Sequence, residues 1–263
     1  MCNYGNKYTE NHMLNKIIIA SVLLASSMSV LALTTAEQKQ VDHLISLFKQ
    51  NNVPAISQSI RYPLTREAPI PTVENAQEMQ KRFNQIFDAE LRQKIVHSSP
   101  QQWDSVGWRG MMFDGGKIWF DGEKITAVNY SSKAEQQLKQ QLILKQKQHL
   151  HPSLRSFKEP KFSFTTKSFQ VRIDQLNNGQ YRYASWKVSQ PQSTKPDLIL
   201  NQGLVKFDGS GGNHYYIFNS GPYRYTIERN VIGADETAPV RLIVTQSKKV
   251  ILDQSGKILD NVR

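Results

Sequence analysis

Apolar residues recur at helical spacing in two stretches of the N-terminal half, and each stretch follows a residue that can cap a helix. The first begins behind Thr34 and Glu37, which have the spacing of a capping box. Its apolar stripe consists of Val41, Leu44, Ile45 and Phe48. The second begins behind Asn75, and its stripe consists of Met79, Phe83, Ile86, Phe87 and Leu91. Both patterns predict helices with one buried face.

In the next part of the chain the period changes from helical to alternating. Apolar and aromatic runs are separated there by two Asp-Gly turns, which predicts a three-stranded antiparallel meander. We expect the strands over residues 106–113, 117–120 and 124–130. Alternation along the first strand places Trp108 and Met112 on one face, and Met111 and Arg109 on the other.

A third helix is predicted behind Ser132, where the apolar face is thin and most other positions are Gln or Lys. That face consists of Leu138, Leu142 and Leu150. A thin stripe is typical of a helix that lies over a surface, so this helix is interpreted as a connector. From Lys161 onward, short alternating runs are separated by turn signals. They predict about seven to nine strands that close into an antiparallel barrel or sandwich.

Together these patterns predict an α+β protein, with N-terminal helices over a curved antiparallel sheet and then an all-β barrel or sandwich. We place the α+β domain at residues 33–131, the connector helix at 132–152 and the all-β domain at 153–263. The apolar content of 39% and the charged content of 21% are those of a globular chain, so disorder of the whole protein is not expected.

The first 32 residues have the pattern of a secretory signal peptide. Lys16 supplies the positive start, an apolar run follows, and small residues lead to Ala32. We therefore assign residues 1–32 to a signal peptide that is cleaved after Ala32, with Ala36 as the second candidate. The apolar run is shorter than the roughly 20 residues of a membrane span, so no transmembrane segment is expected in the mature chain.

Residues 1–12 precede the charged start of this signal and are interpreted as an over-extended reading frame whose true start is Met13. The only cysteine of the chain, Cys2, lies among them, so the exported protein is expected to contain no disulfide. The localisation that follows is the periplasm, or secretion, after cleavage of the signal peptide.

The chain is strongly basic, with 33 Lys and Arg against 22 Asp and Glu and a formal net charge of +11. Residues 1–32 carry +1 of this charge, which leaves +10 for the mature chain. Such a surface favours anionic neighbours, such as an anionic envelope component or another protein with acidic groups. The densest basic run, 139–147, is diluted with glutamine, so binding to nucleic acid is not expected.

Residues 207–214, with the sequence FDGSGGNH, form the most distinctive short motif of the second half. The Asp and Gly before the serine are transposed relative to the Gly-Asp-Ser-Gly-Gly of trypsin-like proteases. No lysine follows for a phosphate loop, and a glycine occupies the third ligand position of a calcium loop. The motif therefore predicts a glycine-rich hairpin or bulge with Ser210 as a turn residue. Its backbone, flanked by Asn213 and His214, stays a candidate contact surface for a ligand or partner.

Two further pairs of residues were weighed for chemistry. His149 and His151 have no third or fourth ligand at matching spacing, so no metal site is predicted. Asp88 and Glu90 stand two residues apart on a predicted helix and do not face each other, so they are not assigned to acid–base catalysis. No catalytic residue and no cofactor follow from the sequence.

Aromatic and arginine side chains gather within and before the predicted meander. The candidate ligand-binding residues among them are Arg61, Tyr62, Trp108, Arg109 and Trp119. Aromatic faces and guanidinium groups can together hold a sugar or a planar acid, by stacking and by bidentate hydrogen bonds. The alternative interpretation is that the tryptophans pack in the core and at the contact between the domains.

Three motifs in residues 36–130 carry a resemblance to a known fold: the sequence RYPL at 61–64, Phe87-Asp88, and the run 115–120. This part resembles exported bacterial domains of the nuclear-transport-factor-like, or cystatin-like, α+β cone. The resemblance implies helices that close over a curved sheet and leave a tapered apolar pocket. Enzymes of that family carry an Asp or His inside the cone, and no such residue falls plainly on an inward position here. The second half resembles β-rich C-terminal domains of exported bacterial proteins.

We therefore interpret the chain as a non-catalytic periplasmic binding or accessory protein of the bacterial cell envelope. Two alternatives stay open on the sequence. One is a hydrolase or isomerase that acts on a small substrate in the cone pocket. The other is an immunity-type inhibitor protein.

Overall fold

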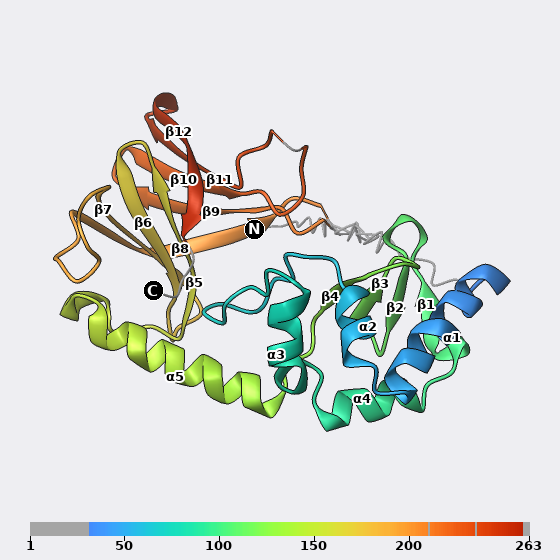
Figure 1. Ribbon diagram of the computed structural model, residues 1–263. Coiled ribbons are helices and arrows are strands. Elements are labelled where there is room, and N and C mark those ends of the chain that lie inside the picture. Colours follow the sequence, from blue (N-terminus) through green and yellow to red (C-terminus); the bar gives the residue numbers. More distant parts are fainter. Residues whose placement is uncertain (1–31, 210, 235, 260–263) are drawn as a thin grey trace, which may run out of the picture.

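The computed structural model describes residues 32–259 except 210 and 235. Figure 1 shows a helical part with a small sheet on one side, a β-barrel on the other, and one long helix running beneath both. The predicted signal peptide lies outside the described residues, apart from Ala32. In the part of the chain that the structure describes, no helix is long and apolar enough to cross a membrane.

The helices begin where the capping residues predicted them. The Thr34 side chain accepts from the amide of Glu37, whose carboxylate accepts from the amide of Thr34, so the predicted capping box is confirmed. Asn75 and Ser132 cap the next two predicted helices, each by accepting through its side chain from the amide three residues later. The helices are α1 (Thr35–Lys49), α2 (Val53–Gln58), α3 (Ala76–Ile86), α4 (Ala89–Val96) and α5 (Lys133–His149).

The second predicted stripe is divided between two helices. Helix α3 ends at Ile86, and Asp88 caps α4 by accepting a hydrogen bond from the Leu91 amide at 2.9 Å. The Asp88 carboxylate also accepts from the hydroxyl of Tyr130 at 2.9 Å. The break therefore turns the apolar stripe so that both helices face one core.

Helices α1 to α4 contribute to a core with a four-stranded antiparallel sheet in the order β1-β2-β3-β4. Its strands are β1 (Trp103–Ser105), β2 (Met111–Phe113), β3 (Ile118–Phe120) and β4 (Ile125–Val128). Alternate side chains enter the core, which explains the alternating burial along each of the first three strands. The buried residues from the sheet are Trp103, Met111, Phe113, Ile118, Phe120, Ile125 and Val128.

The prediction of one strand over residues 106–113 is wrong. A 3-10 turn at Gly107–Arg109 separates β1 from β2, and the glycines at 107 and 110 have φ angles of +59° and +82°. A Cβ on Gly110 would collide with the backbone of Phe120, so glycine is required there. Trp108 consequently leaves the sheet and does not share a face with Met112.

The second half is a closed eight-stranded barrel, in which every strand pairs with its neighbours in sequence and the last pairs with the first. This confirms the predicted α+β fold with a C-terminal antiparallel barrel. The strands are β5 (Glu159–Thr166), β6 (Phe169–Gln175), β7 (Tyr181–Lys187), β8 (Leu198–Phe207), β9 (His214–Ser220), β10 (Tyr223–Arg229), β11 (Val240–Gln246) and β12 (Lys249–Leu259). Its interior is filled by aromatic and branched side chains, including Phe164, Val171, Tyr183, Phe218 and Ile227.

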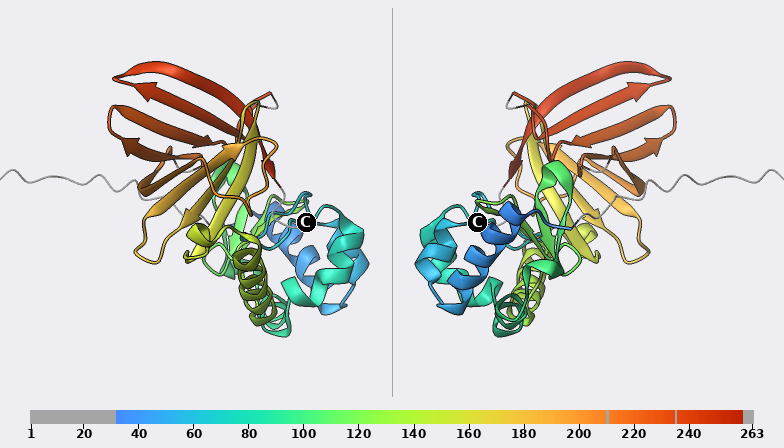
Figure 2. Two further views of the ribbon diagram at one scale, coloured as in Figure 1. Left: turned by 90° about the vertical axis from the view of Figure 1, so that its left-hand side faces the viewer. Right: turned by 90° about the vertical axis from the view of Figure 1, so that its right-hand side faces the viewer.

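The buried face of α5 differs from the predicted stripe. Of the predicted stripe, Leu150 at the end of the helix is buried, but Leu138 and Leu142 are only half-buried, and the buried positions within α5 are Glu135, Lys139 and Ile143. The prediction failed because charged groups from distant segments, and not apolar ones, cover most of this face. Figure 2 shows α5 passing along the base of the barrel and beside the helical part.

Ion pairs fix α5 to both parts of the molecule. Glu135 is fully buried and accepts from Nε of Arg66 at 2.9 Å, and Nη2 of the same guanidinium forms a second, short contact with it. Lys139 donates to Glu67 at 2.5 Å and to Glu159 of β5 at 3.1 Å. Helix α5 therefore connects the segment before α3 to the barrel through ion pairs.

The capping box of α1 gives a pH-dependent prediction. The backbone hydrogen bond from Thr34 lowers the pKa of Glu37 below its ordinary value of 4.5, and Ser105 of β1 also donates to this carboxylate at 3.0 Å. A lowered folded pKa means that the stabilisation is fully present above pH 4.5 and is lost as the pH falls through the folded value. Glu37→Gln is therefore expected to unfold more easily than the parent at pH 7, by about 0.3–1 kcal/mol.

The difference between parent and variant should shrink as the pH falls through the lowered folded pKa of Glu37, because the parent carboxyl then becomes neutral as well. Thermal unfolding followed by circular dichroism between pH 7 and pH 3 measures this. A stability difference between parent and Glu37→Gln that persists unchanged at the lowest pH would show that the charge of Glu37 does not cause it.

Candidate functional site

Arg61 and Tyr62, the predicted ligand-binding residues that precede the sheet, both form contacts within the protein. Arg61 is an exposed side chain that pairs with Asp121 in the turn after β3. The Tyr62 hydroxyl donates to the carbonyl of Ser57 at 2.7 Å. Burial raises the pKa of Tyr62 to about 12, so the hydroxyl is neutral at physiological pH and serves as a donor.

The aromatic residues of the meander are separated from one another. Trp108 is 84% exposed at the tip of the turn between β1 and β2, and the Arg109 guanidinium lies 5.6 Å from the centre of its ring. Trp119 is half-buried on the opposite side of β3 from the core, where it lies close to Gly116. Among the described contacts, Arg61, Tyr62 and the Trp108–Arg109 pair therefore have different partners.

The glycine motif is a hairpin loop, as predicted, because β8 and β9 pair directly on either side of it, from Leu204↔Ile217 to Phe207↔His214. Ser210 lies outside the described residues. The Asn213 side chain holds the neighbouring loop by accepting from the amides of Val231 and Ile232 and donating to the carbonyl of Ile232. Nδ1 of His214 lies 2.7 Å from the carbonyl of Gly212. Both predicted residues therefore shape loops at one end of the barrel.

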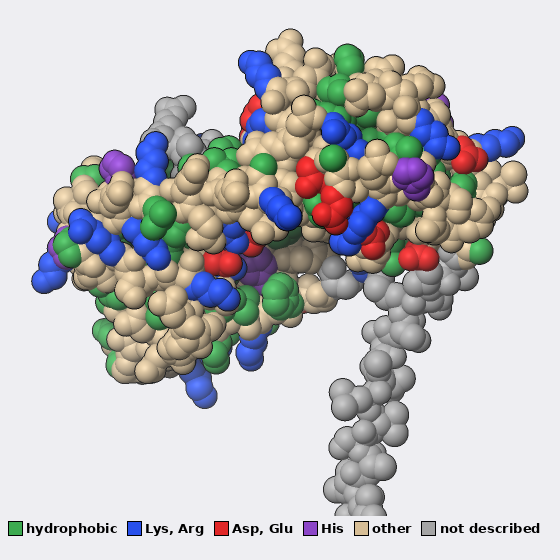
Figure 3. All heavy atoms as spheres, turned by 90° about the horizontal axis from the view of Figure 1, so that it is seen from below, with side chains coloured by type: hydrophobic (Ala, Val, Ile, Leu, Met, Phe, Trp, Pro, Cys, Tyr) green, Lys and Arg blue, Asp and Glu red, His purple; other side chains and the backbone are tan. Residues whose placement is uncertain are grey.

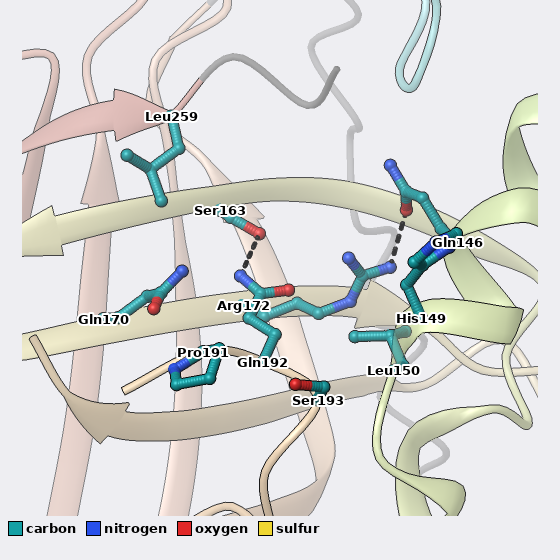
Figure 4. Close-up of a pocket in the computed structure, with 10 residues that line it drawn as sticks. All are labelled: Gln146, His149, Leu150, Ser163, Gln170, Arg172, Pro191, Gln192, Ser193 and Leu259. Atoms are coloured by element: carbon teal, nitrogen blue, oxygen red, sulfur yellow. Dashed lines mark hydrogen bonds between the residues drawn. The ribbon is translucent and has the colours of Figure 1, made fainter. Parts of the chain in front are cut away.

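A cavity of about 380 Å³ lies between the C-terminal end of α5 and the outer wall of the barrel. Figure 4 shows its lining residues, which come from α5, β5, β6, the loop before β8 and the end of β12. They are Gln146, His149, Leu150, Ser163, Gln170, Arg172, Pro191, Gln192, Ser193 and Leu259. One arginine, one imidazole, three carboxamides and two hydroxyls are thus combined with three apolar side chains. Among the described residues that line the cavity there is no carboxylate.

The loop that closes one side of this cavity is fixed in place. Trp186 on the outer face of β7 is fully buried under it and donates from its indole nitrogen to the carbonyl of Thr194 at 3.0 Å. The backbone amide of His151 donates to the carbonyl of Gln192 at 3.2 Å, and the Gln192 carboxamide donates to Ser163 at the same distance. The cavity is therefore built into the fold and needs no rearrangement to form.

Arg172 belongs to a buried cluster on the outer wall of the barrel. Alternation along β6 turns its neighbours Val171 and Ile173 into the barrel, so Arg172 and Asp174 face outward beneath α5. Nε of Arg172 donates to Asp174 at 2.8 Å, and Nη2 of Arg182 donates to the other carboxylate oxygen at 2.7 Å. The side chains are only 4%, 0% and 4% exposed in the order Arg172, Asp174 and Arg182.

This cluster contains two guanidinium groups and one carboxylate, so it carries an excess positive charge. The terminal nitrogens of Arg182 also donate to the carbonyls of Leu154 and Ser156 at 2.7 and 3.1 Å, whereas its buried Nε has no hydrogen-bond partner among the described residues. The Phe157 ring is in contact with both arginines, and Nζ of Lys147 also lies 4.7 Å from its centre. The Arg172 part of the cavity wall is therefore a buried, positively charged group, which favours an anion beside it.

The guanidinium of Arg172 is the group of this cluster that lines the cavity. Its Nη2 donates to the Gln146 carboxamide at 3.0 Å, and Figure 4 shows it lying beside Gln146 and His149. Nη1 has no hydrogen-bond partner among residues 32–259 as described. Nδ1 of His149 lies 2.8 Å from the carbonyl oxygen of Lys145, and no hydrogen bond of Nε2 is found among the described residues. Nη1 of Arg172 is therefore a donor that the described part of the lining can offer to an anion.

Sequence reasoning missed this site. Arg172 and Asp174 have the alternating pattern of solvent-facing strand residues, and only α5 and Phe157 bury them. The Asn178-Gly179 turn indicates that β6 and β7 pair, but a two-residue hairpin there would place Asp174 opposite Tyr183, whereas the structure pairs Asp174 with Arg182. Nothing local indicates that a helix and a distant loop cover the pair.

On the face seen from below, the basic side chains do not gather in a single concentrated patch. Figure 3 shows Lys and Arg side chains spread over that face, with acidic side chains among them over the helical part. Within the described ranges, no group of three or more His, Cys, Asp or Glu side chains is arranged to hold a metal ion.

Comparison of the chain with models of known protein families, with curated proteins and with solved structures gave no significant match.

Proposed function

We propose that the protein is a non-catalytic binding protein that holds a small anionic ligand in the cavity between α5 and the barrel. The observation that carries this proposal is the Arg172 guanidinium, which is 4% exposed and lines a cavity without a carboxylate among its described residues. A buried arginine that is not fully neutralised is costly, and an anion that completes its pairing relieves that cost.

The chemistry of the lining favours binding over catalysis. Its groups are mostly carboxamides, hydroxyls and apolar side chains, which fix the orientation of a ligand and do not transfer protons readily. Its volume of about 380 Å³ lies near the lower end of the range of about 300–1,000 Å³ for small-molecule sites. A ligand of one or two rings fits that size.

We place this activity in the bacterial cell envelope, after export and cleavage behind Ala32. The proposed signal peptide and the +10 charge of the mature chain support this location and an anionic envelope component as the source of the ligand. The helical part is proposed to be a nuclear-transport-factor-like cone, a proposal that its motifs and its helices over a four-stranded sheet support.

A pair of glutamine variants tests the proposal. Gln170→Glu places a carboxylate in the cavity lining, whereas Gln148→Glu makes the same charge change at an exposed position of α5 that does not line the cavity. Acetate and inorganic phosphate, titrated at low salt and followed by NMR, should bind the parent saturably. Gln170→Glu should weaken that binding at least about tenfold, which corresponds to about 1.4 kcal/mol.

Gln148→Glu should change the affinity less than about twofold, because solvent and salt screen an exposed charge. Equal weakening in both variants would mean that only the net charge matters. Failure of both anions to bind the parent saturably would reject the proposed function.

A further inference from the structure

We infer that the ligand of this cavity is an acidic monosaccharide unit, a sugar ring that bears a carboxylate. The inference rests on the proposed function and deepens it, because it names the class of anion. Three features of the lining separate such a ligand from a simple inorganic or aliphatic anion: its acceptor groups, its apolar side chains and its size.

The first feature is the number of hydrogen-bond acceptors in the lining. The Gln192 carboxamide donates to Ser163, which leaves its oxygen as an acceptor. The Gln170 carboxamide and the Ser193 hydroxyl also combine donors with acceptors. An anion without hydroxyl groups, such as acetate, can only accept, so it cannot donate to these oxygens. The hydroxyls of a sugar both donate and accept, which matches a lining of this kind.

The second feature is the apolar part of the lining. Leu150, Pro191 and Leu259 contribute side chains without hydrogen-bonding groups, and they come from three different elements around the cavity. The C–H groups of a sugar ring can pack against such side chains while its hydroxyls reach the polar ones. Acetate or phosphate is too small to contact both kinds of surface at once.

The third feature is the position of the charged group. The Arg172 guanidinium extends toward Gln146 and His149, away from Gln170 and Ser163 (Figure 4). A carboxylate bound to Nη1 of Arg172 would therefore leave the rest of the ligand beside the amides and hydroxyls. A ligand with one charged end and a neutral polyhydroxylated body suits this separation.

The test is isothermal titration calorimetry of the purified full chain with matched ligands. The acidic sugars are glucuronate, galacturonate and N-acetylneuraminate, the neutral sugars are glucose and galactose, and the simple anions are acetate and inorganic phosphate. At least one acidic sugar is expected to bind about tenfold or more tightly than the neutral sugars and the simple anions.

Each other outcome has a distinct meaning. Simple anions that bind as tightly as every acidic sugar would overturn the inference and leave the proposed anion-binding function standing. Neutral sugars that bind as tightly as the acidic ones would overturn the role of Arg172 in the proposed function and in the inference alike. Absence of binding by every anion in the panel would reject the proposed function together with the inference.

A variant separates the contribution of the sugar body from that of the charge. Gln170→Leu keeps the approximate volume of the side chain and removes its hydrogen-bonding groups, with Gln148→Leu as the matched exposed control. The affinity for the acidic sugar should fall about 3- to 10-fold in Gln170→Leu, while the affinity for acetate stays unchanged. Equal loss for sugar and acetate would contradict the inference.

Discussion

Replacing Asp174 by asparagine is expected to lower the free energy of unfolding by about 3–5 kcal/mol, the largest effect of any single substitution considered for the barrel. Asp174 is the fully buried carboxylate that accepts from both Arg172 and Arg182. Asparagine has the same shape, but it leaves two guanidinium groups desolvated and without an anion. Its amide nitrogen also faces one of the arginine donors, because an amide has only one acceptor oxygen. Urea unfolding followed by circular dichroism measures the loss.

Asp253→Asn is the matched control for this experiment. Asp253 also accepts two hydrogen bonds from an arginine on the outer wall of the barrel, Arg241, at 2.6 and 2.5 Å. Both side chains are well exposed, at 44% for Arg241 and 39% for Asp253, so the pair is expected to contribute no more than about 1 kcal/mol. Equal losses in the two variants would show that the burial of the Asp174 cluster has no energetic consequence.

Arg66→Met is expected to cost a similar amount, about 3–5 kcal/mol, by releasing α5 from the helical part. The Arg66 side chain is 4% exposed, and its guanidinium pairs with Glu135, which is fully buried. It also donates to the carbonyls of Val128 and Tyr130, at the end of β4 and just beyond it. Methionine fills part of the space, yet it leaves a buried carboxylate and two buried acceptors without donors.

Arg61→Met makes the same substitution five residues earlier, in an ion pair whose arginine is 63% exposed. It should change the stability by less than about 1 kcal/mol. The double variant Arg66→Met with Glu135→Met should recover part of the loss, because no unpaired charge then remains buried. A double variant that is less stable than Arg66→Met alone would contradict this explanation.

The elements that local chemistry determines could be predicted from the sequence. Thr34, Asn75 and Ser132 cap helices where predicted, because a cap acts on amides two or three residues away. The glycines of the 207–214 loop and the alternation on either side predicted the hairpin between β8 and β9. The closed barrel followed from the same kind of local signal, repeated along the second half.

The predictions that were wrong concern features that depend on residues far apart in the chain or on backbone conformation. The buried face of α5 could not be predicted, because the partner of Glu135 is Arg66, 69 residues earlier. Trp108 was placed on a sheet face because the pattern of residues 106–113 alternates. The positive φ angles of the glycines on either side interrupt that strand and expose the tryptophan.

The cavity was beyond prediction for the same reason. Its lining combines the end of α5, two neighbouring strands, the loop before β8 and the end of β12. Arg172 has the sequence pattern of an exposed strand residue, and its burial depends on Phe157 and on α5, which cross over it. Only the assembled structure shows that its charge lies in a cavity.

The central claim is that an anion binds at the Arg172 guanidinium, and the most direct measurement is the side-chain Nε–Hε NMR signal of that residue during a titration with acetate. The signal is predicted to move saturably, while the corresponding signal of Arg241 on the exposed wall of the barrel stays in place. A titration in which the Arg172 signal does not move, while signals elsewhere in the chain do, would contradict the account.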